Sequence, residues 1–297
     1  MKKFLFIVLR FSFLPFIFRL LVQRKKVTIL LFHNPTVNAF DKSLIYLKQK
    51  YNIISLENYI QYLKGNKPNK LPNNAMIITF DDGHIANYDL LPIIIKHKVP
   101  LTIFLCAGIV NSNRHFWFKH KVNGISTSFL KTISNKERKD LLKENSFDED
   151  AEFQDAQALQ KNQIMEMIPF VNMQSHTMFH PILPKCNSKE SMIEILESKS
   201  LLESEYAISI DTLSYPNGDY SNRDIENAMK AGYKCGITVD YGFNDTNTDI
   251  FRLKRISVND TENISELIVK SSGVWGFIKS RNGKKQSYGF QEIPVNG

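Results

Sequence analysis

The feature that most constrains the fold is a repeated alternation of short apolar runs with longer segments of helical character. The runs are rich in β-branched residues, and each has the length of a buried strand. This alternation predicts βα units arranged around a parallel sheet. We expect seven strands, at residues 27–32, 75–80, 101–105, 170–174, 212–215, 235–239 and 255–258.

The segments between these strands predict helices and their ends. We expect helices at residues 43–50, 56–64, 85–97, 156–168, 189–207, 222–231 and 262–271. Ser188 and Ser221 are expected as N-caps, and Gly232 follows the end of a helix. A chain of 297 residues is long enough for one large domain with a full core, as an α/β barrel requires.

The charge and the cysteines exclude several classes of function. The formal net charge is +8, which favours anionic surroundings such as an acidic glycan or lipid headgroups. The basic residues are scattered rather than gathered in a stripe with aromatic residues, so we do not expect nucleic acid as a partner. Cys106, Cys186 and Cys235 are odd in number and far apart, which argues against a disulfide framework or a thiolate metal site.

Residues 1–26 are strongly apolar with basic residues at both ends. Arg10, Arg19 and Pro15 interrupt the run and argue against a helix that spans a bilayer. We find no small-residue cleavage site before Val27, so we expect a retained membrane-associating segment and a membrane-associated or cell-envelope protein. The alternative is an unusually apolar N-terminal helix packed on the domain.

Two further segments depart from the alternating pattern. Residues 111–155 are strongly charged after an aromatic patch that includes Trp117, and they predict an insertion after the third strand. In a βα barrel such an insertion lies at the active-site face, where it can line a groove; the alternative is a solvated helical excursion with a packed tryptophan. Residues 273–297 show little periodicity and are expected to form a peripheral C-terminal tail.

Two adjacent carboxylates follow the second predicted strand, in Thr79-Phe80-Asp81-Asp82-Gly83. Adjacent side chains on a strand diverge, so one carboxylate can bind a metal ion while the other faces a bound water. The alternative is that the pair merely caps the helix that begins near Ile85.

A pair of histidines, His176 and His180, follows the fourth predicted strand. Residues four apart lie on one face if the segment is helical, and can then share one cation. In a barrel the pair opens onto the same face as Asp82. Two histidines and one aspartate suit Zn²⁺ or a similar cation such as Co²⁺ or Ni²⁺, with an open position for substrate.

Two other predicted strands also end in polar residues. The loop Tyr215-Pro216-Asn217-Gly218 is rigid in composition, and its backbone N–H groups can face a developing oxyanion. His33 comes directly after the first predicted strand. Four strand ends therefore bring chemistry to one predicted face.

Together these motifs resemble the polysaccharide deacetylase family, carbohydrate esterase family four, with its chitooligosaccharide-deacetylase homology domain. The resemblance rests on Thr-Phe-Asp-Asp-Gly at 79–83, Ser-His-Thr-x-x-His at 175–180 and Tyr-Pro-x-Gly at 215–218, and runs from about residue 27 to 258. It implies an α/β fold, a distorted (β/α)7 TIM-like barrel forming a single domain over residues 27–272.

The resemblance also implies roles for individual residues. Asp81 is expected as the general base, and Asp82, His176 and His180 as ligands of a divalent metal ion. The Asn217 N–H group, in the loop that Tyr215 and Pro216 begin, is expected to donate to the oxyanion. The implied reaction is hydrolysis of a linear amide that removes N-acetyl groups from an N-acetylated glycan.

The sequence departs from the family pattern beside the base. Many members have an arginine where this chain has Ser214. We expect charged residues near the last strand, Asp249, Arg252 and Arg255, to replace that charge partner.

A second departure concerns the general acid. The family commonly supplies it from a late histidine, and this chain has no histidine after His180. We expect His33, or Asp81 after it is protonated, to protonate the leaving amine. A subgroup acting on poly-N-acetylglucosamine-type polysaccharides shows similar simplification. The alternatives are a membrane-tethered glycan-binding protein and a deacylase of another acylated sugar.

Overall fold

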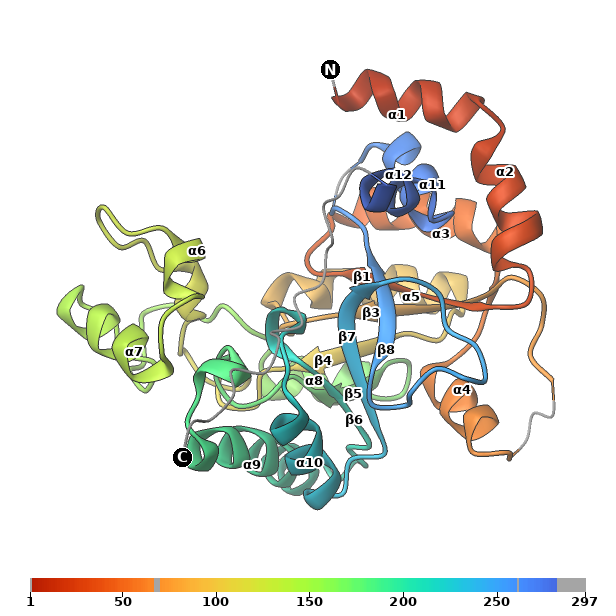
Figure 1. Cartoon of the computed structure of the whole chain (residues 1–297). Coiled ribbons are helices and arrows are strands. Elements are labelled where there is room, and N and C mark those ends of the chain that lie inside the picture. The colour runs from red at the N-terminus through yellow and green to blue at the C-terminus, as the bar shows by residue number, and fades with distance from the viewer. Residues whose placement is uncertain (1, 67–69, 261, 282–297) are drawn as a thin grey trace, which may run out of the picture.

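Seven parallel strands form a closed barrel in the computed structural model, which describes residues 2–66, 70–260 and 262–281 (Figure 1). The ring closes because β1 (Val27–Phe32) pairs with β3 (Ala75–Phe80) on one side and with β8 (Leu253–Ser257) on the other. The remaining strands, in ring order from β3, are β4 (Thr102–Leu105), β5 (Asn172–Ser175), β6 (Thr212–Ser214) and β7 (Cys235–Tyr241). The predicted barrel is confirmed, and each predicted strand is present with its ends within two residues.

The central strands form because their apolar runs are buried on both faces. All six residues of β1 and all six of β3 are buried, and the two strands pair in register from Val27 opposite Ala75 to Phe32 opposite Phe80. Strands covered on both sides are expected to be apolar throughout rather than alternating. The sequence missed β2 (Asn52–Ile53), which pairs with β3 and is too short to leave a pattern.

Helices follow the strands as predicted. They are α3 (Val37–Lys50), α4 (Leu56–Leu63), η2 (Ile85–Leu90), α5 (Leu91–His97), α8 (Lys161–Met167), η4 (Leu183–Lys185), α9 (Ser188–Tyr206), η5 (Pro216–Gly218), α10 (Asn222–Lys230) and α11 (Ile264–Ser271). Ser221 is the N-cap of α10, as predicted. The prediction for Ser188 is wrong, because Asn187 accepts the hydrogen bond from the Glu190 N–H group and is the N-cap of α9.

The insertion after β4 has a small core of its own and projects from the barrel (Figure 1). It contains η3 (Trp117–Lys119), α6 (Thr127–Leu130) and α7 (Asn135–Glu144). Trp117 is only 1% exposed and packs in this core, with the Arg138 guanidinium over its ring, as in the alternative that we left open. The insertion nevertheless lines the cavity at the carboxyl ends of the strands, through Phe118 and Lys131.

The two ends of the described chain pack together above the barrel (Figure 1). The N-terminal end consists of α1 (Lys2–Phe11), α2 (Leu14–Phe18) and η1 (Arg19–Gln23), and the C-terminal end forms α12 (Val274–Arg281). The ring centroids of Phe6 and Trp275 are 4.8 Å apart, and Phe6 is buried. The expected tail thus begins as a helix against the barrel, while residues 282–297 lie outside the described part of the chain. The division at residues 26 and 272 stays a prediction.

None of the described helices is by itself long and apolar enough to cross a bilayer. The pair Lys3–Phe11 and Leu14–Gln23 passes that test of length and composition when taken together, although it is bent by 62°.

Candidate active site

The predicted site residues converge on one cavity of about 410 Å³ at the carboxyl ends of the strands. His33 follows β1, Asp81 and Asp82 follow β3, and His176 follows β5. These four line the cavity, together with His180 and Asn217. The expectation that separate strand ends meet at one face is therefore confirmed. Tyr215 and Pro216 are buried and are not among the residues that line it.

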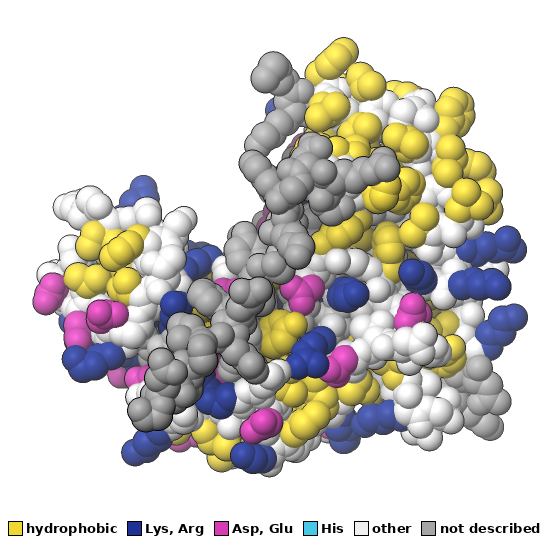
Figure 2. All heavy atoms as spheres, viewed as in Figure 1, with side chains coloured by type: hydrophobic (Ala, Val, Ile, Leu, Met, Phe, Trp, Pro, Cys, Tyr) yellow, Lys and Arg dark blue, Asp and Glu magenta, His cyan; other side chains and the backbone are white. Residues whose placement is uncertain are grey.

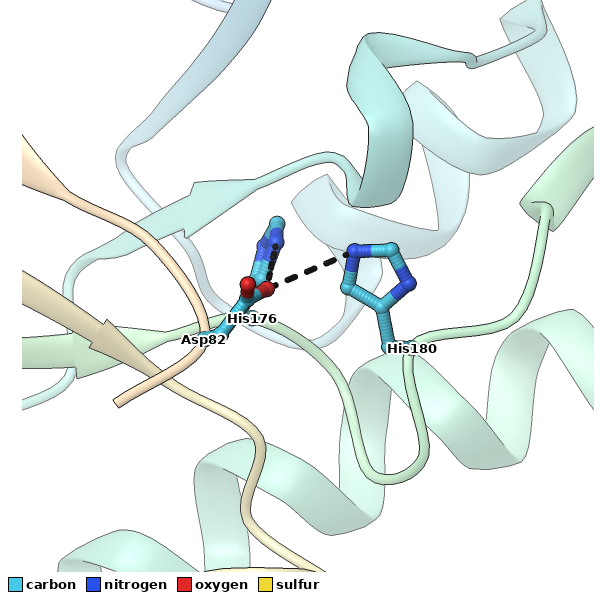
Figure 3. A group of neighbouring side chains, drawn as sticks. All are labelled: Asp82, His176 and His180. Atoms are coloured by element: carbon cyan, nitrogen blue, oxygen red, sulfur yellow. Dashed lines mark ion pairs between the residues drawn. The ribbon is translucent and has the colours of Figure 1, made fainter. Parts of the chain in front are cut away.

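Asp82, His176 and His180 form a cluster whose potential ligand atoms all lie within 4.8 Å of one another (Figure 3). Asp82 Oδ1 is 3.5 Å from His176 Nε2 and 3.6 Å from His180 Nε2. Two ligand atoms that each lie about 2 Å from a tetrahedral ion are about 3.3 Å apart. The spacing and the donor set therefore fit a small divalent cation.

A loop, not a helix, brings the two histidines together. Thr177 has φ 67° and His180 has φ 57°, so the backbone turns back in the left-handed region. The buried Glu194 carboxylate on α9 supports the turn, because its Oε2 accepts hydrogen bonds from the N–H groups of Met178 (2.9 Å) and Phe179 (3.0 Å). The segment is therefore not helical, and the two histidines are paired by this turn rather than by helical spacing.

The insertion also holds in place the loop of residues 176–180, which carries the two histidines. The Trp117 Nε1–H group donates a hydrogen bond of 2.9 Å to the His180 carbonyl, and both residues are buried. The segment that interrupts the βα pattern is thus part of the support of His180.

Both histidines direct their Nε2 atom toward Asp82 in the cluster. His176 Nδ1 is 2.8 Å from the Ser214 carbonyl, which can only accept, so we assign the proton to Nδ1 and the lone pair to Nε2. Burial, together with the neighbouring His176, lowers the pKa of His180 to about 3. Neutral imidazoles with free lone pairs are the form that binds metal ions.

Asp81 is held in a buried ion pair with Arg255 of β8. Arg255 Nη1 is 2.7 Å from Asp81 Oδ1, and Nη2 is 2.8 Å from Oδ2. Arg255 Nη2 also donates to Ser214 Oγ at 2.9 Å. Burial by itself would raise the pKa of Asp81, but the charge and hydrogen bonds of Arg255, together with neighbouring histidines, hold that pKa below its ordinary value.

Asp249 and Arg252 are not the partner of Asp81. Their side chains pair with each other at 2.6 Å and are exposed. They precede β8, at the end of the barrel opposite the site, whereas Arg255 lies within the strand and is buried. Of the residues we named near the last strand, Arg255 fills the place of the missing family arginine.

His84 also contributes to the cluster, although no motif in the sequence singled it out. Its Nε2 is 3.2 Å from Asp82 Oδ2, and its Nδ1 is 2.9 Å from Lys119 Nζ. An ammonium only donates, so Nδ1 accepts and the Nε2–H group donates to Asp82. This hydrogen bond orients the Asp82 carboxylate, as residues that hydrogen-bond to a metal ligand commonly do. Its position directly after Gly83 was the available signal.

The loop after β6 places Asn217 at the cavity in the left-handed conformation, with φ 58°. Two charged neighbours fix its side-chain amide. Lys131 Nζ donates to Oδ1 at 2.6 Å, and Asn217 Nδ2 donates to Asp219 Oδ2 at 2.5 Å. The Tyr215 hydroxyl anchors the base of the loop by donating to the Phe251 carbonyl at 3.1 Å. The role of the Asn217 N–H group stays a prediction on this fixed loop.

The backbone of His33 is fixed on both sides, and the residue is half-buried. Its N–H group donates to Asp260 Oδ1 at 3.1 Å, and its carbonyl accepts from Asn87 Nδ2 at 2.9 Å. His33 lines the same cavity as Asp81. This location is compatible with its expected role as proton donor, which stays a prediction.

The family model described as polysaccharide deacetylase matches residues 68–236, more than half of the chain. The poly-beta-1,6-N-acetyl-D-glucosamine N-deacetylase of Staphylococcus aureus (strain N315) is 23% identical over 225 residues, which are 75% of this chain and 67% of the relative. YxkH of Bacillus subtilis (strain 168) is 23% identical over 192 residues, 64% of this chain. That match spans about half (53%) of the length of YxkH.

Solved structures show the same fold. IcaB from Ammonifex degensii superposes with a TM-score of 0.61 and 19% identity, covering 84% of this chain and 98% of that chain. At this identity the likeness concerns the arrangement of strands and helices.

Proposed function

The chain belongs to the polysaccharide deacetylase family, and on that premise we propose that it is a metal-dependent hydrolase of N-acetyl groups on the amino sugars of a polysaccharide. One observation carries the proposal. A buried carboxylate, Asp81, is kept ionised by Arg255 and lies beside the cluster of Asp82, His176 and His180. The name of the S. aureus relative supports poly-N-acetylglucosamine as the type of substrate.

The geometry supports a division of labour among the side chains. A water between the acetyl carbonyl and Asp81 attacks the carbonyl carbon while the Asp81 carboxylate takes its proton. The C–N bond then breaks, the amine receives a proton from His33 or from protonated Asp81, and acetate leaves. A divalent cation held by Asp82, His176 and His180, such as Zn²⁺, Co²⁺ or Ni²⁺, would supply Lewis-acid polarisation of the carbonyl.

The ion pair between Asp81 and Arg255 favours an enzyme over a glycan-binding protein without catalysis. A binding protein has no use for a buried base, and burying its charge costs free energy unless a partner such as Arg255 is present. Both residues line the cavity in which we propose that the acetyl group binds.

Removing the metal ion is expected to lower acetate release from N-acetylglucosamine oligomers by at least about 100-fold, because the carbonyl loses its electrophilic partner. The test compares untreated, chelated and Zn²⁺-restored protein, with metal content measured in each. Metal binding to the folded chain is also expected to raise its melting temperature, which provides a readout apart from activity. A full rate in protein shown to be metal-free would refute metal dependence. No acetate from metal-loaded protein would point to another acyl group or to binding alone.

We further propose that the N-terminal helices lie in the surface of a membrane. Half of the exposed large hydrophobic side chains described, 11 of 22, fall within residues 4–22. Figure 2 shows hydrophobic side chains gathered over this part of the molecule, with Lys and Arg side chains below them at its right-hand edge. Arg10 and Arg19 turn inward instead, toward Ser265 and Tyr46, each at 3.4 Å. Helices of this kind bind interfacially, and basic neighbours favour anionic lipids.

Replacing both Phe13 and Leu21 with Asp is expected to weaken binding to vesicles of phosphatidylglycerol and phosphatidylcholine by more than about tenfold. Each side chain is 74% exposed, and burying one such side chain contributes about 1.5–3 kcal/mol. Phe13 has φ 61°, a conformation that Asp tolerates, so the fold should persist. Met229→Asp, on the exposed face of α10, is the matched control. Equal sedimentation of all three proteins with vesicles would contradict this proposal.

A further inference from the structure

The described lining of the cavity carries more positive than negative charge. It includes four cationic side chains, Lys131, Arg255, Lys270 and Lys279, and two carboxylates, Asp81 and Asp82. Arg255 is engaged with Asp81, and Asp82 faces the histidines of the proposed metal site. Three lysines therefore surround the cavity in addition to the groups that the proposed reaction uses.

Two of these lysines lie on the wall formed by α11 and α12. Lys270 Nζ pairs with Glu266 Oε1 at 3.0 Å, and Glu266 also accepts from Asn259 Nδ2 at 2.6 Å. Lys279 Nζ lies 5.7 Å from the centre of the Trp275 ring. Burial lowers the pKa of Lys270, and the nearby positive charge of Lys279 lowers it further, while Glu266 opposes both. Glu266 already balances the charge of Lys270, so Lys279 is the cation of this wall without a carboxylate partner among the described residues. An anion bound beside both lysines would therefore meet a net positive charge.

The third lysine extends from the insertion. Lys131 reaches the loop after β6 and donates to Asn217 Oδ1, a neutral acceptor, so its charge remains available to the cavity. Burial lowers the pKa of this lysine, and Asp219 and Asp82 partly oppose the effect. A bound sugar at the metal cluster thus meets positive charge on the insertion as well as on the wall of α11 and α12.

We infer that the acetylated glycan carries an anionic group, a phosphate or a carboxylate, which binds against Lys270 and Lys279. This inference rests on the proposed deacetylase function. A neutral polymer gains nothing from an excess of ammonium groups, whereas an anionic one is attracted and oriented by them. Deacetylation leaves an ammonium on the product, which the same lysines repel, so the charge distribution also favours product release.

The position of α12, between the cavity and the N-terminal helices, suggests two sources for the anion. Trp275 lines the cavity and also contacts Phe6 of α1, and the ring centroids of Phe277 and Phe18 are 5.3 Å apart. The wall that bears Lys279 therefore also supports the proposed membrane-binding helices. Two sources offer an anion there: a phosphate that links a sugar to a lipid, and an acidic sugar within a polymer.

The experiment measures acetate release from three substrates by the metal-loaded, full-length chain. One is a neutral N-acetylglucosamine tetramer, the second alternates N-acetylglucosamine with glucuronate, and the third is N-acetylglucosamine joined through a phosphate to a short lipid in detergent. We expect KM about tenfold lower for an anionic substrate than for the neutral one, the size of one charge-assisted hydrogen bond, with little change in kcat. The advantage should disappear in Lys279→Gln with Lys270→Gln and should persist in Lys230→Gln, an exposed lysine on α10.

Calorimetry with glucose 1-phosphate and glucose tests the subsite without catalysis, because neither sugar carries an acetyl group. Glucose 1-phosphate should bind at least about tenfold more tightly than glucose, and the lysine double variant should lose this preference. If the phosphate bound only to the metal ion, the double variant would keep the preference. Equal KM for neutral and anionic substrates, or a preference that survives in the double variant, overturns the inference. Lysine-dependent binding without any acetate release would leave the subsite standing and reject the deacetylase function. The anionic substrate whose KM is lowered, the glucuronate polymer or the lipid phosphate, identifies the source of the anion.

Discussion

Asp81→Asn is expected to lower the rate of acetate release by about 10³-fold while the protein still binds its metal ion. The substitution keeps the shape of the side chain but removes the negative charge that accepts a proton from water, and general-base catalysis contributes roughly 10²–10⁴-fold. Asp81 is the carboxylate of the pair that Arg255 keeps ionised, whereas Asp82 faces the histidines. The loss should therefore appear in kcat with bound metal unchanged.

The control for Asp81→Asn must separate lost chemistry from lost folding. The variant leaves the Arg255 guanidinium buried without its counter-charge, so we expect a lower melting temperature as well as a lower rate. Rates are therefore compared well below that melting temperature, together with the metal content of each protein. Asp249→Asn removes an exposed aspartate that pairs with Arg252 and should retain the full rate. Wild-type turnover by a folded, metal-loaded Asp81→Asn protein would show that another group is the base.

The barrel could be predicted from the sequence because its strands are buried on both sides. A strand such as β3 must then be apolar along its whole length, and all six of its residues are buried. The catalytic motifs follow such runs directly, so their common location at one end of the barrel followed from the fold. β2, with two residues, carried no such pattern.

In the loop of residues 176–180, the two histidines are paired as their spacing predicted, but the cause of the pairing is a turn and not a helix. Spacing of four between His176 and His180 is also helical spacing, but the turn depends on left-handed residues and on the Glu194 carboxylate. Glu194 is distant enough in the chain that only tertiary packing brings it to the loop. Propensity cannot reveal a conformation that a remote side chain stabilises.

The identity of the residue that pairs with Asp81 could not be decided from the sequence for a related reason. Arg255 is separated from Asp81 by 174 positions, and near the last strand the sequence offered several charged residues. The choice depends on which of them lies within β8 and is buried inside the barrel. In β8, Lys254 is exposed and Arg255 is buried, so the two neighbouring basic residues point to opposite faces of the strand. The boundary, placed two residues late in our prediction, hid that arrangement.

The contact between the two ends of the chain was only half visible in the sequence. The apolar N-terminal run left open a helix packed on the domain, but nothing indicated α12 as its partner. α12 lines the cavity because Trp275 packs against Phe6 from the other end of the chain. The residues of α12 show little amphipathic pattern by themselves, and we expected a peripheral tail. Docking of this kind is decided by surface complementarity between distant segments.

Arg255→Met is expected to destabilise the fold by about 3–5 kcal/mol and to move the acidic limb of the rate profile to higher pH. Breaking a buried ion pair on one side leaves an uncompensated charge, which accounts for the loss of stability. The guanidinium holds the pKa of Asp81 below its ordinary value of 3.8, so without it burial raises that pKa. The base must be ionised to act, and a higher pKa therefore removes activity at low pH first. The pH dependence of kcat/KM and of thermal unfolding measures both effects.

The lowered pKa of Asp81 also predicts how the stability difference between Arg255→Met and the wild type depends on pH. A carboxyl whose pKa is lowered on folding stabilises the native state above its unfolded pKa, and this contribution is lost as pH falls through the folded pKa. In Arg255→Met that contribution disappears, so the stability difference from the wild type should be largest near neutral pH and shrink in acid.

Moving the arginine provides the decisive comparison, because Ser214 Oγ already lies 2.9 Å from Arg255 Nη2, beside Asp81. The double variant Ser214→Arg with Arg255→Ser returns a guanidinium to the position that many family members use. It should recover part of the stability and restore the acidic limb toward the wild type, whereas Ser214→Arg alone should place two guanidinium groups together and destabilise the fold. If the acidic limb stays at its wild-type pH in Arg255→Met, then the ion pair is structural and does not set the pKa of the base.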